Sequence, residues 1–242
     1  MALAASTGSP CPVVHIADHD PRSRDALCAV LSSVGFETRL FATVDELLGC
    51  RPGPGPSCLV MEYRLQGMNG LELRSRLLHA GIPMPVIFMS AHADIPIAVR
   101  AIKAGAVDFL TKPVRTQDVL DAVHTALEWD AALKADLRAR GELEVQLGCL
   151  TQREREVMWH VTAGLMNKQV AGLLGLSEIT VKVHRSNVMR KMGARSLADL
   201  IAKANVLAQV RAQDESRGPL RHAADRPRRA LPATFVGNPT SA

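Results

Sequence analysis

A chain of 242 residues is long enough for two ordinary domains. Apolar residues make up 47% of it and aromatic residues only 3%, so we expect hydrophobic cores of Leu, Val, Ile, Ala and Met. No run approaches the about 18 consecutive apolar residues that a membrane-spanning helix needs, and residues 1–10 lack the pattern of a signal peptide. The five cysteines are scattered without metal-ligand spacing, which favours a reducing cytoplasm.

The net charge of +5 is distributed unevenly along the chain. Residues 1–128 carry 11 basic and 13 acidic side chains, whereas residues 150–212 carry 10 basic and 4 acidic ones. This asymmetry indicates that only the second half of the chain meets a polyanion.

The first half alternates short apolar stretches with amphipathic ones. Strands are expected at Val13–Ala17, Glu37–Ala42, Cys58–Met61, Val86–Met89 and Ala106–Leu110. Helices are expected at about 21–34, 43–49, 69–80, 95–104 and 115–128. These repeats predict an α/β domain over residues 13–128, with a flavodoxin-like, doubly wound, five-stranded parallel sheet covered by helices on both faces. Its functional crevice is expected at the carboxyl ends of the strands.

Other segments are assigned from composition. Residues 51–56 read Arg-Pro-Gly-Pro-Gly-Pro and predict a loop. Residues 1–12 form an N-terminal tail, and residues 129–148 a helical linker whose Leu residues suggest pairing with a second copy, although two or three heptads are too few for a coiled coil. Residues 213–242 are rich in Pro, Arg and Ala without periodicity, which predicts a disordered tail.

Residues 149–212 carry the signals of a helical domain. Thr151 and Glu154 form a capping box, which predicts a helix that starts at residue 152. This pattern indicates an all-α unit that is distinct from the α/β domain.

The next two helices are separated by a three-residue turn. Asn167 is expected to cap a helix through Leu174, and Gly175 suits its left-handed exit. Ser177 is expected to cap a third helix that runs to Gly193. Two helices joined by such a turn are typical of a helix-turn-helix that reads DNA.

One face of the third helix is polar and cationic. At 100° per residue, Val181, Val188 and Met192 lie together and are expected to pack inward. The residues assigned to DNA contact on the other side are Lys182, Val183, Arg185, Ser186, Asn187 and Arg190. Lys182 is expected to donate to guanine and Val183 to touch a thymine methyl group, while the arginines and Asn187 suit phosphates. A merely solvated helix face is the alternative, and Val183 within the polar arc argues against it.

This segment closely resembles the LuxR/NarL-type helix-turn-helix over most of residues 150–200. The matching residues are Glu154, Gly164, Lys168, Ala171, Leu174, Ser177, Thr180-Val181-Lys182 and His184. The resemblance implies a four-helix domain, with a fourth helix after Ser196 that often makes the dimer contact on DNA.

The first half resembles a response-regulator receiver of the FixJ type across most of residues 13–125. The matching pieces are Val14–Asp18, Gly67–Gly70, Ile87–Ser90 and Lys103–Pro113. The resemblance implies a pocket formed by Asp18, His19, Glu62, Ser90, Phe109 and Lys112, and a cis peptide bond at Lys112-Pro113.

Two pocket positions depart from the family pattern. His19 stands where receivers carry a second acid, and Glu62 where they carry the phosphate-accepting Asp. Imidazole is a poor substitute for a hard anionic ligand of Mg²⁺. Glu62 places its carboxylate about one C–C bond, ~1.5 Å, from the in-line position, and mispositioning by about 1 Å can slow a positioned reaction ~100-fold. Normal phosphotransfer and Mg²⁺ binding are therefore not expected.

Three interpretations of the altered pocket stay open. Glu62 can extend its charge toward Lys112 and Ser90 and imitate an aspartyl phosphate, which predicts a permanently active-like receiver. Alternatively the receiver is only a dimerisation scaffold. In the third, Asp20 restores metal binding or a kinase still modifies the pocket, and a transition-metal site that includes His92 is a variant of this interpretation.

The sequence thus predicts a cytoplasmic, homodimeric, two-component-type transcriptional regulator that binds double-stranded DNA and carries an atypical, phosphorylation-independent receiver. The rival hypothesis is a protein-interaction module that docks and titrates a sensor kinase or partner regulator. No nucleophile–base pair stands outside the altered pocket, so an enzyme is not expected. No metal or other cofactor is assigned.

Overall fold

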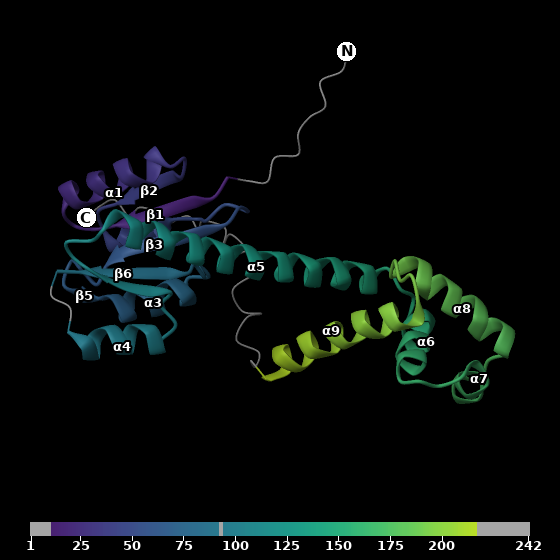
Figure 1. Ribbon diagram of the computed structural model, residues 1–242. Helices are drawn as coiled ribbons and strands as arrows, with labels where there is room; N and C mark the ends of the chain where they lie inside the picture. The colour runs from purple at the N-terminus through teal and green to yellow at the C-terminus, as the bar shows by residue number, and fades with distance from the viewer. Residues whose placement is uncertain (1–10, 92–93, 217–242) are drawn as a thin grey trace, which may run out of the picture. The chain divides into compact units, whose positions relative to one another are not determined.

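The computed structural model describes residues 11–91 and 94–216. The described residues form two compact units, units 1 and 2, which divide within one helix between Ala139 and Arg140 (Figure 1). Among the described residues, no helix is both long and apolar enough to cross a membrane.

Unit 1 contains the predicted five-stranded parallel sheet. Its strands are β1 (Val13–Ala17), β2 (Glu37–Phe41), β3 (Ser57–Glu62), β6 (Val86–Ser90) and β7 (Asp108–Thr111). They lie in the order β2-β1-β3-β6-β7, and every neighbouring pair is parallel. The last strand begins at Asp108 rather than 106, because the Ala106 amide still bonds to the Ala101 carbonyl at the end of the preceding helix.

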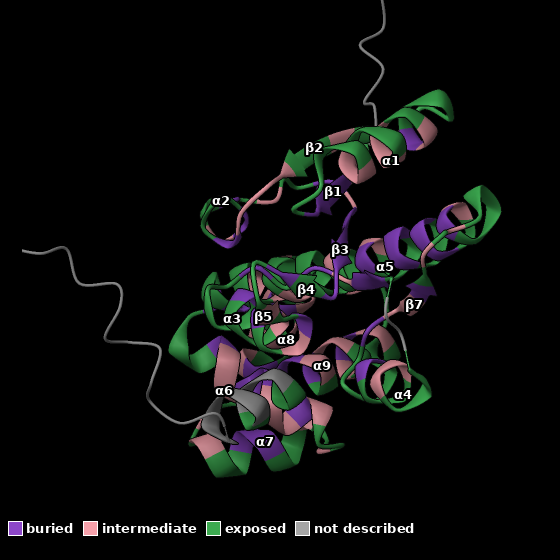
Figure 2. Ribbon diagram, turned by 90° about the vertical axis from the view of Figure 1, so that its left-hand side faces the viewer, coloured by how far each residue is buried: buried purple, intermediate pink, exposed green. Residues whose placement is uncertain are grey.

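Helices cover both faces of this sheet, as predicted (Figure 2). They are α1 (Pro21–Ser33), α2 (Val44–Gly49), α3 (Gly70–His79), α4 (Ile95–Lys103) and α5 (Thr116–Gly148). One core joins the sheet to α1 and α5 through Leu31 and Val123. The other core joins it to α2 and α3 through Leu47 and Leu73.

A short hairpin follows β3 and was not predicted. Strands β4 (Arg64–Leu65) and β5 (Met68–Asn69) pair antiparallel. Gln66 and Gly67 between them both have positive φ, 50° and 80°, which matches the tight two-residue turn whose twist suits a hairpin.

Helix α5 runs through the predicted boundary between domain and linker. Its 33 residues join the predicted helix 115–128 and the predicted helical linker 129–148 without a break, and Gly141 lies inside it. Its first part packs on the sheet of unit 1, while Leu143 and Leu147 belong to a core of unit 2.

Besides the end of α5, the described part of unit 2 contains four helices, as predicted. They are α6 (Gln152–Thr162), α7 (Asn167–Leu174), α8 (Glu178–Lys191) and α9 (Leu197–Ser216). Two small cores hold them together, one around Met158, Val188 and Leu200 and the other around Val161 and Val181.

Most of the predicted helix ends are confirmed. Thr151 and Glu154 form the capping box, Gly175 is left-handed with φ 67°, and the Ser177 side chain caps α8. The prediction that Asn167 caps α7 is wrong. Met166 is the cap residue, because the Gln169 side chain accepts its amide hydrogen bond at 2.8 Å and Asn167 is already helical.

Helix α9 extends further than predicted. It runs to Ser216, so residues 213–216, which were assigned to the disordered tail, are helical. Residues 217–242 of that tail and residues 1–10 of the N-terminal tail lie outside the described residues.

Candidate receiver pocket and nucleic-acid interface

The predicted pocket residues meet at the carboxyl ends of the parallel strands. Asp18 follows β1, Glu62 and Ser90 end β3 and β6, and Lys112 follows β7. Lys112 Nζ lies 2.6 Å from Asp18 Oδ2 and also donates a hydrogen bond to Glu62 Oε2. One ammonium group therefore bridges the two pocket carboxylates, which are 44 positions apart in the sequence.

Burial and charge act against each other in this ion triad. Asp18 has no exposed surface and Glu62 is 7% exposed. Burial acts to raise the pKa of Asp18, but hydrogen bonds from Lys112, the Asp20 amide and Ser23 hold it below its ordinary value. Burial likewise acts to lower the pKa of Lys112, and the two carboxylates raise it. Asp18 and Lys112 therefore stay charged together near neutral pH.

His19 lies at the rim of the pocket. Its side chain is 64% exposed, and Nδ1 lies 3.7 Å from Asp18 Oδ1. Asp20, considered above as a substitute acid, caps α1 instead: its carboxylate accepts the Arg22 amide at 3.1 Å. The Asp20 amide in turn donates to Asp18 Oδ1 at 2.9 Å.

Ser90 and Phe109 complete the predicted set. Ser90 is 5% exposed, and its carbonyl oxygen accepts the Lys112 amide at 2.9 Å. The half-buried Phe109 ring meets the Tyr63 ring edge-on, with centroids 5.5 Å apart. The Lys112-Pro113 bond is cis, as predicted.

Two contributors were missed by the sequence analysis. Tyr63, directly after Glu62, is 5% exposed and also contacts the Phe88 ring. Arg24 donates to the Asp18 carbonyl oxygen at 2.6 Å. The adjacency of Tyr63 to Glu62, and the position of Arg24 in the first turn of α1, were the available signals.

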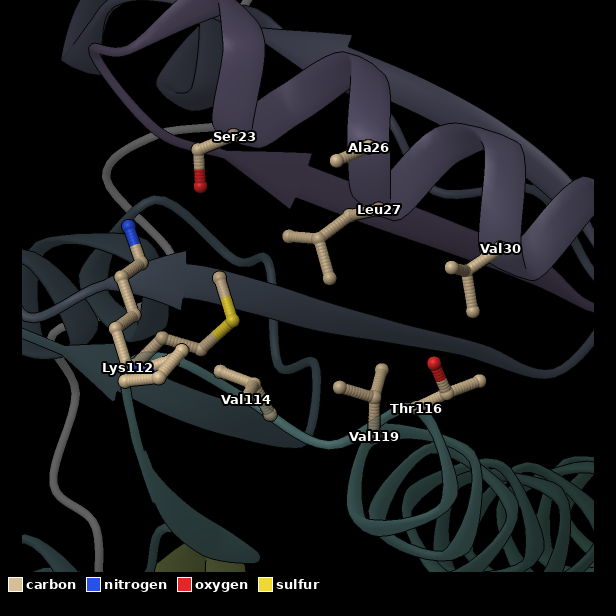
Figure 3. Close-up of a pocket in the computed structure, with 10 residues that line it drawn as sticks. Ser23, Ala26, Leu27, Val30, Lys112, Val114, Thr116 and Val119 are labelled. Atoms are coloured by element: carbon tan, nitrogen blue, oxygen red, sulfur yellow. The ribbon is translucent and has the colours of Figure 1, made fainter.

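A cavity of about 260 Å³ opens beside Lys112, between α1 and the start of α5 (Figure 3). Its walls include Leu27 and Val30 of α1 and Val114 and Val119 from the other side. Among the described residues, no three His, Cys, Asp or Glu side chains are grouped to hold a metal ion. His92 lies outside the described residues.

In unit 2, helix α8 presents most of the predicted DNA-contact residues to solvent. Lys182, Ser186 and Arg190 are exposed, and Val183 is 55% exposed. The opposite side of the helix is buried at Val181, Val188 and Met192, as predicted. Ile179, one turn before Val183, is 78% exposed. Two apolar side chains therefore share the exposed face with the polar ones.

Two predicted contact residues are half-buried. Arg185 Nη1 donates to Asn167 Oδ1 at 3.1 Å, which ties α8 to the first residue of α7. Asn187 accepts from Arg190 Nη2 at 3.4 Å. Lys191 turns away and pairs with the buried Glu154 at 2.6 Å. Of the cationic side chains on α8, Lys182 and Arg190 are thus the most exposed.

Two family models match the chain. Residues 14–124 match the response regulator receiver domain, and residues 149–204 match the bacterial regulatory proteins of the luxR family.

Curated relatives cover most of both units. Nodulation protein W of Bradyrhizobium diazoefficiens is 45% identical over 81% of this chain and 86% of its own length. Transcriptional regulatory protein FixJ of Rhizobium meliloti is 38% identical over 79% of this chain and 94% of its own. The solved structure of the response regulator StyR is 41% identical with a TM-score of 0.73, over 81% of this chain and 98% of that one. This chain belongs to the FixJ/NodW-type response regulators, which join a receiver domain to a LuxR-type DNA-binding domain.

Proposed function

We propose that this response regulator binds its DNA targets without phosphorylation of its receiver, because Glu62 already supplies a negative charge to Lys112. The observation that carries the proposal is the double contact of the Lys112 ammonium with Asp18 and Glu62. In this proposal the Glu62–Lys112 ion pair stands in for the pair that an aspartyl phosphate would form with the lysine.

Two chemical reasons argue against ordinary phosphotransfer. The longer Glu62 side chain displaces its carboxylate from the in-line position by about one C–C bond, ~1.5 Å, and that oxygen is held by Lys112. The donor set also does not suit Mg²⁺, which prefers carboxylate oxygens and water. Asp18 is already bound to Lys112 and to the Asp20 amide, and His19 offers a nitrogen ligand. We therefore assign no Mg²⁺ to this pocket.

The test compares DNA affinity and protein mass with and without a phosphodonor. The probe is a duplex selected from a random library by the full-length protein, and the phosphodonor is acetyl phosphate with Mg²⁺. We expect the same affinity in both conditions and no gain of a phosphoryl group. Phosphorylation of the wild-type chain accompanied by a rise in affinity would overturn the proposal.

Variants of the pocket separate the remaining interpretations. Glu62→Gln should weaken specific DNA binding about fivefold or more, as for a typical coupling energy, whereas the exposed Glu72→Gln should not. The double variant Glu62→Asp, His19→Asp should bind well only after phosphorylation. Unchanged affinity in Glu62→Gln would contradict the active-like state and favour the scaffold interpretation.

For the DNA contact itself, we propose that Lys182 and Val183 read base edges together with Ser186, and that Arg190 and Asn187 contact phosphates. Arg185 is better suited to holding α7 against α8, because its guanidinium already donates to Asn167. Specific binding should weaken with salt with a log–log slope of about −0.9 for each phosphate neutralised.

Substitutions of the base-reading residues and of the phosphate-contacting residues should have different effects on DNA binding. Lys182→Ala should reduce the preference for the selected sequence, and Arg190→Ala should weaken binding to all sequences and reduce the salt slope by about one. Lys103→Ala, at an exposed position of α4, is the matched control. Absence of any sequence preference in the wild-type chain would favour the rival interaction module.

We further propose that the protein acts in the cytoplasm as a homodimer, since paired readers on two half-sites double the contact with DNA. A sensor kinase or a partner regulator is the protein partner that a receiver domain implies. Sedimentation of the protein with the selected duplex should give two chains per duplex. A ratio of one chain per duplex would contradict the dimer.

A further inference from the structure

The proline–glycine loop before β3 holds part of the linker. Residues 51–56 read Arg-Pro-Gly-Pro-Gly-Pro, and the sequence indicated only a loop. Proline has no backbone N–H and cannot join a regular ladder, while backbone carbonyls near the protein interior still need donors. The donors to the loop carbonyls come from Lys134 and Arg138 of α5, more than 70 positions later in the sequence.

Lys134 lies at the centre of this contact. Its ammonium group donates to the Gly55 carbonyl at 2.6 Å and to Ser57 Oγ at 3.1 Å, and lies 3.5 Å from the Gly53 carbonyl. An ammonium group carries three donors and no acceptor. It therefore matches a loop that presents oxygen atoms.

Asp130 fixes the position of that ammonium group. The carboxylate is 1% exposed, and its Oδ2 accepts the Ser57 amide at 2.7 Å and pairs with Lys134 Nζ at 2.7 Å. A third side chain, Arg138, donates to the Pro54 carbonyl oxygen. The three residues are spaced four apart, so they form one stripe along α5.

We propose that this stripe and the loop 53–57 form a clamp that fixes residues 130–138 of α5 to the receiver. The first half of the predicted linker then moves with the receiver, and it is the segment after Ala139 that belongs to the DNA-binding unit. The clamp lies apart from the pocket, and none of its hydrogen bonds involves Glu62.

Strand β3 connects the clamp to the pocket. Its first residue, Ser57, bonds to Asp130, and its last residue, Glu62, bonds to Lys112. All six residues of the strand are buried, and a strand of this length spans about 17 Å. A shift of Glu62 can therefore be transmitted along β3 to Ser57. The clamp then determines whether residues 130–138 of α5 move together with β3.

Hydrogen exchange of the full-length chain tests the clamp. In the double variant Asp130→Asn, Lys134→Met, the amides of Gly53, Gly55 and Ser57 and of residues 131–138 should exchange about tenfold faster or more, because the charged hydrogen bonds that hold the loop to the helix are lost. Amides of β1 and β6 should change little. Glu128→Gln, at an exposed position of the same helix, is the matched control.

A second measurement tests whether the clamp couples Glu62 to DNA binding. Glu62→Gln should change DNA affinity less in the Lys134→Met background than in the wild-type background, and an equal change in both backgrounds would contradict this coupling. Unchanged exchange of residues 131–138 in the double variant would overturn the clamp, whatever the DNA measurement gives. Equally faster exchange throughout β1 and β6 would also overturn it, since that result indicates unfolding of the whole unit.

Discussion

Lys112 Nζ lies 2.6 Å from Asp18 Oδ2 and also contacts Glu62, so a single cation compensates two buried carboxylates. Removing one partner of a buried ion pair leaves the charge of the other partner buried without compensation. Lys112→Met should therefore lower the free energy of unfolding of unit 1 by about 3–5 kcal/mol at pH 7. Hydrogen exchange of β1 and β3 amides measures this change, and the exposed Lys103→Met is the control.

The pH dependence of this ion triad has a definite sign. The pKa of Asp18 is lowered on folding, so its contribution is present above its unfolded pKa of about 3.9 and is lost as pH falls through the folded value. The pKa of Lys112 is raised, so its contribution is present below about 10.4 and is lost as pH rises through the folded value. In Lys112→Met, burial is no longer opposed by the lysine and raises the pKa of Asp18, so the deficit should be largest near neutral pH and should shrink as the pH falls and Asp18 becomes protonated. A deficit that stays constant from about pH 7 to about pH 4 would contradict the ion triad.

His15 should make the receiver sensitive to acid. It is 1% exposed on β1, and burial, together with the charges of Arg39 and Lys134, lowers its pKa to about 4. The folded state therefore keeps His15 neutral. The free energy of unfolding of unit 1 is unaffected by His15 above about pH 6.5, and it falls as the pH drops toward 4, because the unfolded state then binds a proton at this residue more readily. His15→Leu should remove roughly 2–4 kcal/mol of that loss. Urea unfolding at several values between about pH 7 and 4 gives the free energy of unfolding of the two chains. An equal decrease with falling pH in both chains would rule out this role.

Glu154 should stabilise unit 2 but not unit 1. It is 4% exposed, caps α6 with Thr151, and pairs with Lys191 of α8 at 2.6 Å. Glu154→Gln retains a cap acceptor but loses the charge, which should cost about 1–3 kcal/mol. Burial acts to raise the pKa of Glu154, but Lys191 and Thr151 lower it, so the cost should fall as pH drops below about 4.3. Hydrogen exchange of α6 and α8 measures it, with Glu156→Gln as the surface control.

Gly70 should not tolerate a side chain. A Cβ atom there would lie 2.5 Å from Phe88 Cε1 and 3.1 Å from the Tyr63 carbonyl oxygen. Gly70→Ala should therefore destabilise unit 1 by about 1–3 kcal/mol through overpacking. Gly49→Ala meets nothing within 4 Å and is the matched control. Equal unfolding midpoints for both variants would show that Phe88 moves aside freely.

The sequence determined the features that depend on near neighbours. Thr151 and Glu154 lie three residues apart, so their capping box is visible in the sequence, and the strand and helix order followed from periodicity. The cap of α7 was misplaced at Asn167, because the Gln169 side chain accepts the Met166 amide and no standard cap residue signals it. The altered pocket positions His19 and Glu62 could also be identified from the sequence, because the flanking motifs align them with known receivers.

Only the tertiary structure decided which side chains meet across the fold. Lys112 reaches Asp18 and Glu62 from 94 and 50 residues away. Lys134 reaches the Gly55 carbonyl from 79 residues away. Such pairs produce no periodic pattern in the sequence, because they depend on where parallel strands end and on which face of α5 packs against the sheet. The sequence therefore determined the class of the protein and its unusual pocket residues, whereas folding decided that Lys112 bridges the two carboxylates and that the linker is clamped to the receiver.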